Sequence, residues 1–231
     1  MKIIITFALL ALSISSFSKT CYVPTNLNNE LSGDNRYSKI MRCDKYYIDK
    51  FWDDFNMIKW HWDNGFGYHD VCNNDLPLGR IMNSIFALYL STNLKYPRSI
   101  LNWAYKYAES NISILSVACG DGTLNARNLL SKVTFYMGGL YDDQSVVRRA
   151  GILLHEARHT RKMHNGSNRC ISGGSCDTTW EYQGANQYHV LWLWWYGRHS
   201  RFTTEALKND ALREARWRHD ERFNINPGKN I

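Results

Sequence analysis

Residues 146–159 constrain the fold more than any other stretch of the chain, because their apolar side chains recur at helical spacing. The apolar positions are Val146, Val147, Ala150, Leu153, Leu154 and Ala157. This pattern predicts a helix with one buried face, and Asp142 or Asp143 is the candidate N-cap. The sequence HEARH occupies residues 155–159 at the end of the same helix. A partly buried helix is therefore expected to carry two histidines one turn apart.

Histidines four residues apart lie on one face of a helix, so their rings can converge on one metal ion. Glu156 points roughly 100° around the helix from His155, given 3.6 residues per turn. It misses the ligand position but can reach a water molecule in the open site of a metal, where it would act as general base. The motif predicts one Zn²⁺ bound by His155 and His159, with Glu156 as the catalytic residue. Copper or nickel could bind the same imidazoles, and the alternative to a metal site is a pair of surface histidines flanked by arginines.

A catalytic zinc needs a third protein ligand, and the sequence offers three candidates. His164 lies five residues after His159 and can bind only if the helix breaks near residues 160–162. Glu181 lies 22 residues after His159, near the start of a helix predicted over residues 178–196. Asp177 is the third candidate, and we prefer it as a carboxylate that holds a ligand histidine in the correct tautomer. The choice between these residues stays open.

The HExxH helix resembles the active-site helix of the zincin superfamily of metallopeptidases. The resemblance covers this helix and, more loosely, the predicted strand before it and the helix after it. It implies a zincin-like fold, one zinc ion and a peptide or protein substrate. Lys162 stands where metzincins have a glycine, and Trp180 where gluzincins have an asparagine, so the subgroup is not resolved. The run HEARHT, followed by a histidine, a cysteine, Cys-Asp and Gly-Ala, is also similar to a group of small exported bacterial proteins of uncertain function.

The first 18 residues have the features of a secretory signal peptide. Lys2 gives the positive end, residues 3–12 are apolar, and Ser16-Phe17-Ser18 fits a cleavage site. We therefore expect a secreted or periplasmic protein with one domain over residues 19–231. A lipoprotein would carry its lipid on Cys21, but Thr20 is not the small residue that usually precedes such a site.

Six cysteines in an exported chain predict three disulfides, with fifteen possible pairings. The one specific pair that we predict is Cys170 with Cys176, which closes a short loop containing glycine. A zinc cluster of cysteines is disfavoured because no C-x-x-C sequence occurs.

The remaining pattern predicts an α+β fold that is mostly helical, with a small sheet before the active-site helix. Helices are expected over residues 46–62, 78–94, 99–109, 178–196 and 204–223, and strands over 112–118 and 133–137. The last helix alternates in charge, so we expect it to be exposed.

The net charge of +7 is spread along the sequence, and no nucleic-acid-binding motif or membrane-spanning run accompanies it. The predicted function is a secreted zinc-dependent hydrolase, first of all a metallopeptidase. The alternative is an exported, disulfide-rich binding protein without catalytic activity, which could hold a structural metal.

Overall fold

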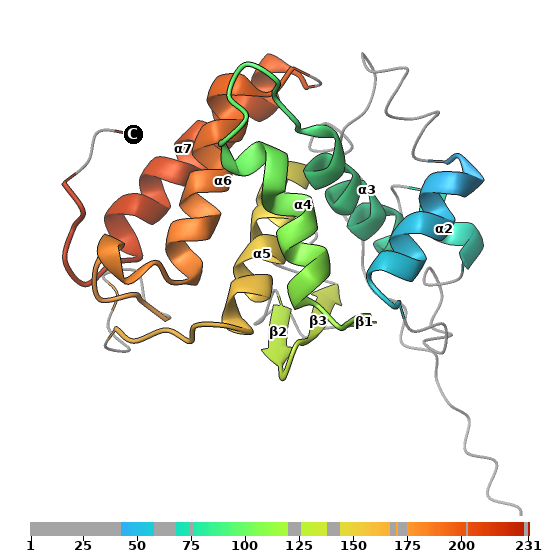
Figure 1. Ribbon diagram of the computed structural model, residues 1–231, viewed down its shortest axis with the longest axis horizontal. Helices are drawn as coiled ribbons and strands as arrows, with labels where there is room; N and C mark the ends of the chain where they lie inside the picture. Colours follow the sequence, from blue (N-terminus) through green and yellow to red (C-terminus); the bar gives the residue numbers. More distant parts are fainter. Residues whose placement is uncertain are drawn as a thin grey trace, which may run out of the picture.

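The computed structural model describes residues 43–57, 68–73, 76–119, 126–137, 144–166, 170, 175–201, 203–228 and 231. The predicted signal peptide, Cys21 and the candidate N-caps Asp142 and Asp143 lie outside these ranges. The described part is a mixed α+β structure of helices with one small sheet, as the sequence predicts (Figure 1). The helices are α2 (Lys45–Asp54), α3 (Pro77–Leu90), α4 (Ile100–Asn111), α5 (Val146–His159), α6 (Ala185–His199) and α7 (Glu205–Glu221). Two short 3-10 helices, η2 (Tyr68–Cys72) and η3 (Trp180–Tyr182), complete the helical elements.

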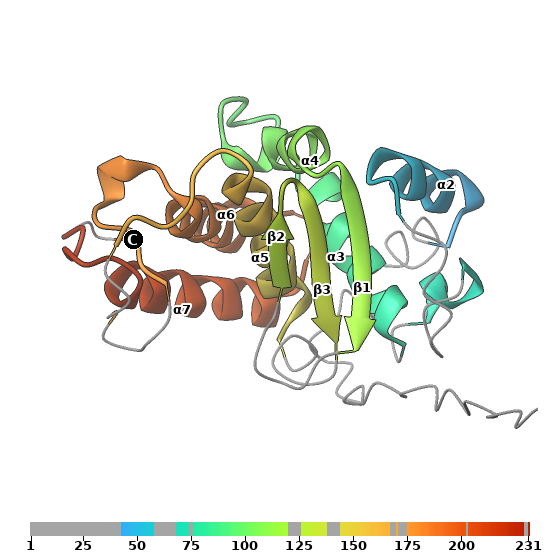
Figure 2. The same cartoon turned by 90° about the horizontal axis from the view of Figure 1, so that it is seen from below.

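The sheet has three strands in the order β1-β3-β2. Strand β1 (Ile114–Cys119) runs parallel to β3 (Lys132–Met137), and β2 (Ala126–Leu129) runs antiparallel to β3. Leu130 and Ser131 join β2 to β3 and both have positive φ, the backbone that a tight two-residue hairpin turn requires. Figure 2 shows the three strands side by side, with α3, α4 and α5 behind them. The sheet therefore covers one side of a helical body and leaves β2 at its edge.

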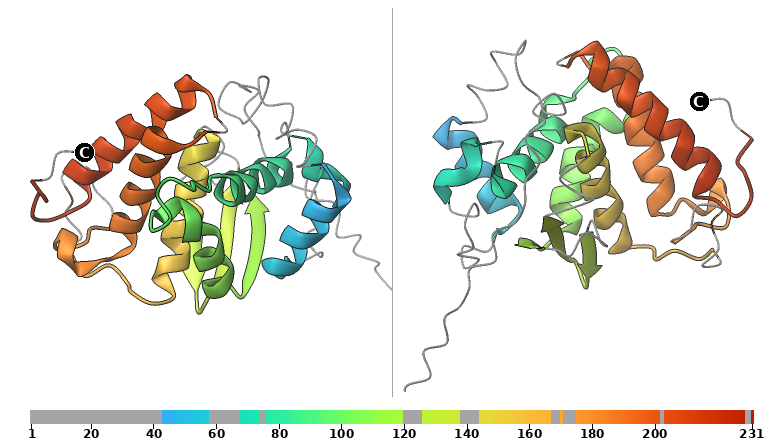
Figure 3. Two further views of the ribbon diagram at one scale, coloured as in Figure 1. Left: turned by 45° about the horizontal axis from the view of Figure 1, so that its top comes forward. Right: turned by 180° about the vertical axis from the view of Figure 1, so that it is seen from behind.

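Helix α5 is the centre of the molecule, because it contacts α3, α4, α6, α7 and β2 (Figure 3). All six apolar positions of its predicted stripe are buried. Its N-cap is Ser145, two residues after Asp143 and three after Asp142. The helix that carries HEARH is thus fixed on several sides, and its last turn faces the edge strand.

Two of the predicted helices at the C-terminal end of the chain are corrected by the structure. The helix expected over residues 178–196 begins only at Ala185, because Gln183 takes a left-handed conformation (φ 58°) that separates η3 from α6. Helix α7 is not simply exposed, since it packs along α6 and buries Leu207, Ala211 and Ala215.

Other boundaries differ by a few residues from the predicted ones. Helix α2 ends at Asp54 instead of residue 62, and α3 ends at Leu90 instead of residue 94. Strand β2 was not predicted. The predicted pair Cys170–Cys176 forms a disulfide, and its Cα atoms are 5.7 Å apart. A second disulfide joins Cys43 to Cys72, with a Cα–Cα distance of 5.3 Å. No described helix combines the length and apolar character needed to cross a bilayer.

Candidate metal centre

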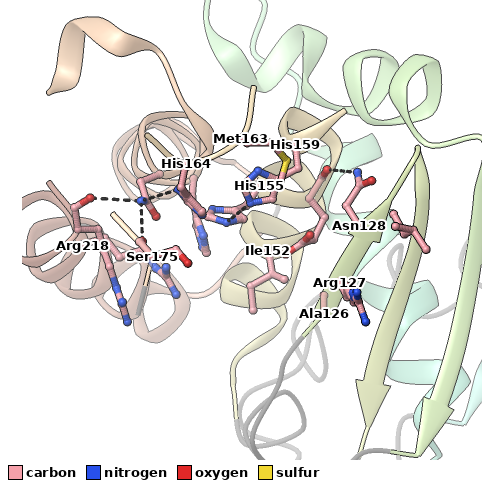
Figure 4. Close-up of a pocket in the computed structure, with 15 residues that line it drawn as sticks. Ala126, Arg127, Asn128, Ile152, His155, His159, Met163, His164, Ser175 and Arg218 are labelled. Atoms are coloured by element: carbon pink, nitrogen blue, oxygen red, sulfur yellow. Dashed lines mark hydrogen bonds between the residues drawn. The ribbon is translucent and has the colours of Figure 1, made fainter. Parts of the chain in front are cut away.

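Three histidines, His155, His159 and His164, gather at the end of α5 (Figure 4). One ring nitrogen from each lies within 4.8 Å of the others. The Nε2 atoms of His155 and His159 are 3.1 Å apart. Two nitrogens bound to one tetrahedral zinc at 2.0–2.1 Å are separated by about 3.3 Å. The spacing of the first two rings therefore fits a shared metal ion before any rearrangement.

The chain breaks the helix directly after His159, and this break brings His164 to the other two rings. Thr160 is the C-cap, and the backbone N–H groups of Arg161 and Lys162 both donate to the Arg158 carbonyl. The loop is then fastened to η3, because Lys162 Nζ donates to the Tyr182 carbonyl at 2.6 Å. A continuous helix would have carried His164 to the opposite side of α5.

Hydrogen bonds to β2 and α4 hold the C-terminal end of α5 in place. Asn128 Nδ2 on β2 donates to the Glu156 carbonyl at 2.6 Å, which is one of the carbonyls that a helix end leaves without a partner. Thr160 Oγ1 donates to the Asn111 carbonyl at 2.8 Å. The last turn of α5 is thereby tied to the sheet and to α4.

Two of the three rings are oriented through their Nδ1 atoms. His159 Nδ1 lies 3.2 Å from the Lys162 carbonyl, which can only accept, so the hydrogen is on Nδ1 and the Nε2 lone pair is free for a metal. His164 Nδ1 lies 2.9 Å from Asp177 Oδ1 and is fixed in the same way. Metal-binding histidines commonly make this kind of second contact.

Asp177 connects His164 to the fold. It is fully buried, and its second oxygen, Oδ2, accepts from the backbone N–H of Asn186 in the first turn of α6 at 3.0 Å. Gly184 permits this approach, because a Cβ there would overlap the Asp177 carboxylate. The structure thus places Asp177 behind His164 instead of in the three-histidine group.

Burial shapes the protonation of the centre. Desolvation, together with the neighbouring histidines, lowers the pKa of His155 well below its usual value and that of His159 to about 4. Both rings are therefore neutral near pH 7, the form that binds metal. Burial also raises the pKa of the Glu156 carboxyl to about 7, an effect opposed by the backbone N–H of Asn128. A carboxyl with such a pKa can accept and release protons near neutral pH.

Glu181, the other predicted third ligand, lies apart from the three-histidine group. It sits on η3, its side chain is exposed, and it does not line the pocket beside the histidines. Glu181 was expected near the start of a helix over residues 178–196, but it lies outside α6 because η3 and α6 are separate elements.

The histidines open into a pocket of about 590 Å³. Residues 126–129 of β2 form one wall, α5 and the 163–164 loop contribute Ile152, Glu156 and Met163, and the remaining lining residues are Ser175, Asn186, His189, Arg218 and Arg222. Sequence reasoning missed the arginines and Asn186, because they lie on α6 and α7, far from the motif. His189 is fully buried, and both of its ring nitrogens lack a hydrogen-bond partner among the described residues.

The donor set fits zinc. Three imidazoles with one ring nitrogen each near a common point, and a carboxyl beside them, form the ligand type that zinc prefers when one coordination position stays open. Comparison of the chain with protein-family models, curated proteins and solved structures finds no match in any of the three.

Proposed function

We propose that the chain is a zinc-dependent hydrolase, and specifically a peptidase, whose ligands are His155, His159 and His164. The observation that carries this proposal is the convergence of the three imidazoles beside Glu156 in an open pocket. A structural zinc site would be closed by four protein ligands. Among the described residues, only these three histidines form such a group.

The residues divide the work of hydrolysis between them. When bound, a zinc ion acts as a Lewis acid, which lowers the pKa of water and polarises a carbonyl. Glu156 takes the proton from the attacking water, and its raised pKa lets it deliver that proton to the leaving amine. His159 and His164 are held in place by the Lys162 carbonyl and Asp177, so the pocket geometry is set before a substrate arrives.

The edge strand favours a peptide substrate. Strand β2 pairs with β3 along one side, and no described strand pairs with its other side. Residues of β2 line the same pocket as the histidines. An extended peptide could add to this edge through backbone hydrogen bonds and so bring a peptide bond to Glu156.

The decisive experiment compares metal content and hydrolysis in the mature protein and in Glu156→Gln. We expect one zinc per chain in both proteins. Cleavage of a mixture of fluorogenic peptides is expected to fall by about 10²–10⁴-fold in Glu156→Gln, because the general base is lost.

Glu181→Gln is the matched control, since it removes the same charge outside the pocket, and it should keep both zinc and activity. Normal turnover by Glu156→Gln would exclude its role as base. A wild-type protein that holds zinc but cleaves no peptide would favour the alternative of a binding protein without catalytic activity.

A further inference from the structure

The pocket beside the histidines is strongly basic. Its lining includes Arg127 on β2, Arg218 near the end of α7 and Arg222 at the C-cap of that helix, whereas Glu156 is its one acidic residue among those described. Figure 4 shows Arg218 on the far side of the three histidines from β2. A bound divalent ion would add further positive charge. The site is therefore built to attract an anion.

The positive charge of Arg218 is only partly neutralised by the carboxylate of Glu214. Its side chain is 11% exposed, and its Nε lies 2.8 Å from Glu214 Oε1. The other oxygen of Glu214 is taken by Arg148 Nη1 at 2.9 Å, so one carboxylate serves two guanidinium groups. Arg218 therefore places a guanidinium group at the pocket wall that has to share its carboxylate partner.

The C-terminal end of α7 is hydrogen-bonded to Asp177, the residue behind His164, and to Asn186. The Arg222 carbonyl accepts from the backbone N–H of Asp177 at 3.1 Å, and Asn186 Nδ2 donates to that carbonyl at 3.2 Å. Arg218 and Arg222 line the same pocket as His155 and Glu156. An anion held by these arginines would lie close to the reacting atoms.

We propose that Arg218 and Arg222 bind a carboxylate of the peptide substrate beside the metal centre. This inference rests on the proposed peptidase function. Guanidinium groups match a carboxylate with two parallel hydrogen bonds, and burial strengthens such contacts. The carboxylate can belong to an acidic side chain or to the free C-terminus of the peptide.

The arginines inside the motif do not supply this site. Arg158 donates to the Gln183 carbonyl and to Tyr107 Oη, and its guanidinium stacks over the Tyr188 ring. Arg161 donates to Asn111 Oδ1. Neither residue lines the pocket.

The test measures peptide binding without cleavage, on zinc-loaded Glu156→Gln protein, by fluorescence anisotropy. Labelled alanine–serine hexapeptides carry one Asp or one Asn at each position in turn, with an amidated C-terminus. A further pair is neutral in its side chains and differs only in a free or amidated C-terminus. We expect one Asp peptide, or the free-acid peptide, to bind at least about tenfold more tightly than its neutral twin, as is typical of a charge-assisted hydrogen-bond pair.

Arg222→Gln and Arg218→Lys, each added to the Glu156→Gln background, should each reduce this ratio by about tenfold or remove it. Arg218→Lys keeps a charge beside Glu214, and if it does not fold, Arg222→Gln decides alone. Arg213→Gln is the matched control: it removes an arginine of the same helix whose side chain is exposed and paired with Asp210, and it should leave the ratio within about twofold.

Equal binding within every pair, or a preference that survives both pocket variants, would overturn the proposal. Failure of the peptidase function has a different signature. In that case the carboxylate preference is present, but zinc-loaded protein with Glu156 intact cleaves none of the peptides.

Discussion

At the scale of single residues, Asp177 does two things at once. Its Oδ1 holds the His164 ring and its Oδ2 accepts from the start of α6. Because it is fully buried, its contacts are not diluted by water. The position of the third imidazole therefore depends on a residue that need not touch the metal.

Asp177→Asn is expected to weaken zinc binding by about 10–100-fold, the usual effect of removing a carboxylate behind a ligand histidine. The reason is that an amide neither carries the charge nor fixes the His164 tautomer as firmly. Competition with a chromophoric chelator measures the zinc Kd. Asp220→Asn changes a second Asp–His pair, with His219, that lies outside the pocket and should leave the Kd unchanged. An unaltered Kd in Asp177→Asn would contradict the positioning role.

The sequence alone could place His155, Glu156 and His159 together, because helical geometry fixes residues one turn apart. It could not choose between His164 and Glu181. That choice depends on where α5 stops and on the left-handed Gln183, which are set by contacts with β2, α4 and η3. The sequence also could not predict that Arg218 and Arg222 belong to the site, because only the packing of α7 against α6 brings them to the pocket.

At the scale of elements, the close packing of α5 on α6 depends on Gly151. A Cβ at this position would overlap the ring of His189 and lie 3.1 Å from Trp192 Cδ1. Both rings are fully buried, so neither can move aside without disturbing the core. The absence of a side chain lets the two helices approach next to the histidine group.

Gly151→Ala should therefore destabilise the protein by about 1–3 kcal/mol, as overpacking does, although alanine favours helices more than glycine. Urea unfolding of the metal-free protein measures the change. His189→Ala removes the ring that a Cβ at position 151 would overlap. Gly151→Ala introduced into that variant should therefore lower the free energy of unfolding much less than in the wild-type background. Equal costs in the two backgrounds would show that the His189 ring is not the obstacle.

The helices with strong apolar periodicity were predictable, and the four-residue strand β2 was not. Its sequence, ARNL, is too short and too polar to indicate a strand, and its conformation comes from pairing with β3. The 3-10 helix η3 was merged into the following helix, although Gly184 stands between the two elements and disfavours a continuous helix.

At the scale of the whole molecule, the two described disulfides lie in different regions. Cys43–Cys72 joins the start of α2 to η2, far from the pocket along the chain. Cys170–Cys176 closes a short loop next to Asp177, and the Cys176 carbonyl accepts from the Gly166 N–H at 2.9 Å. The local pair was predictable from its spacing, whereas the first was one of many possible connectivities.

Removing the two disulfides should have separable effects. The Cys43→Ser/Cys72→Ser double variant is expected to lose about 3–4 kcal/mol of stability, because it frees a long loop in the unfolded chain, and to retain zinc affinity. The Cys170→Ser/Cys176→Ser variant should lose less stability but bind zinc more weakly, since Asp177 loses its anchored neighbour. Denaturant unfolding and zinc competition on both variants check this contrast. Identical zinc affinities would show that the loop has no influence on His164.

The backbone of Asp177 also bonds to the far end of α7, through the Arg222 carbonyl and the Asn224 N–H. The residue that orients His164 is thus itself held by residues that follow it by 45 and 47 positions in the chain. During synthesis, a ribosome must release α7 and the residues just after it before this junction can close. A chain that stops before α7 would carry the HEARH helix without the hydrogen bonds that hold Asp177 behind its third imidazole.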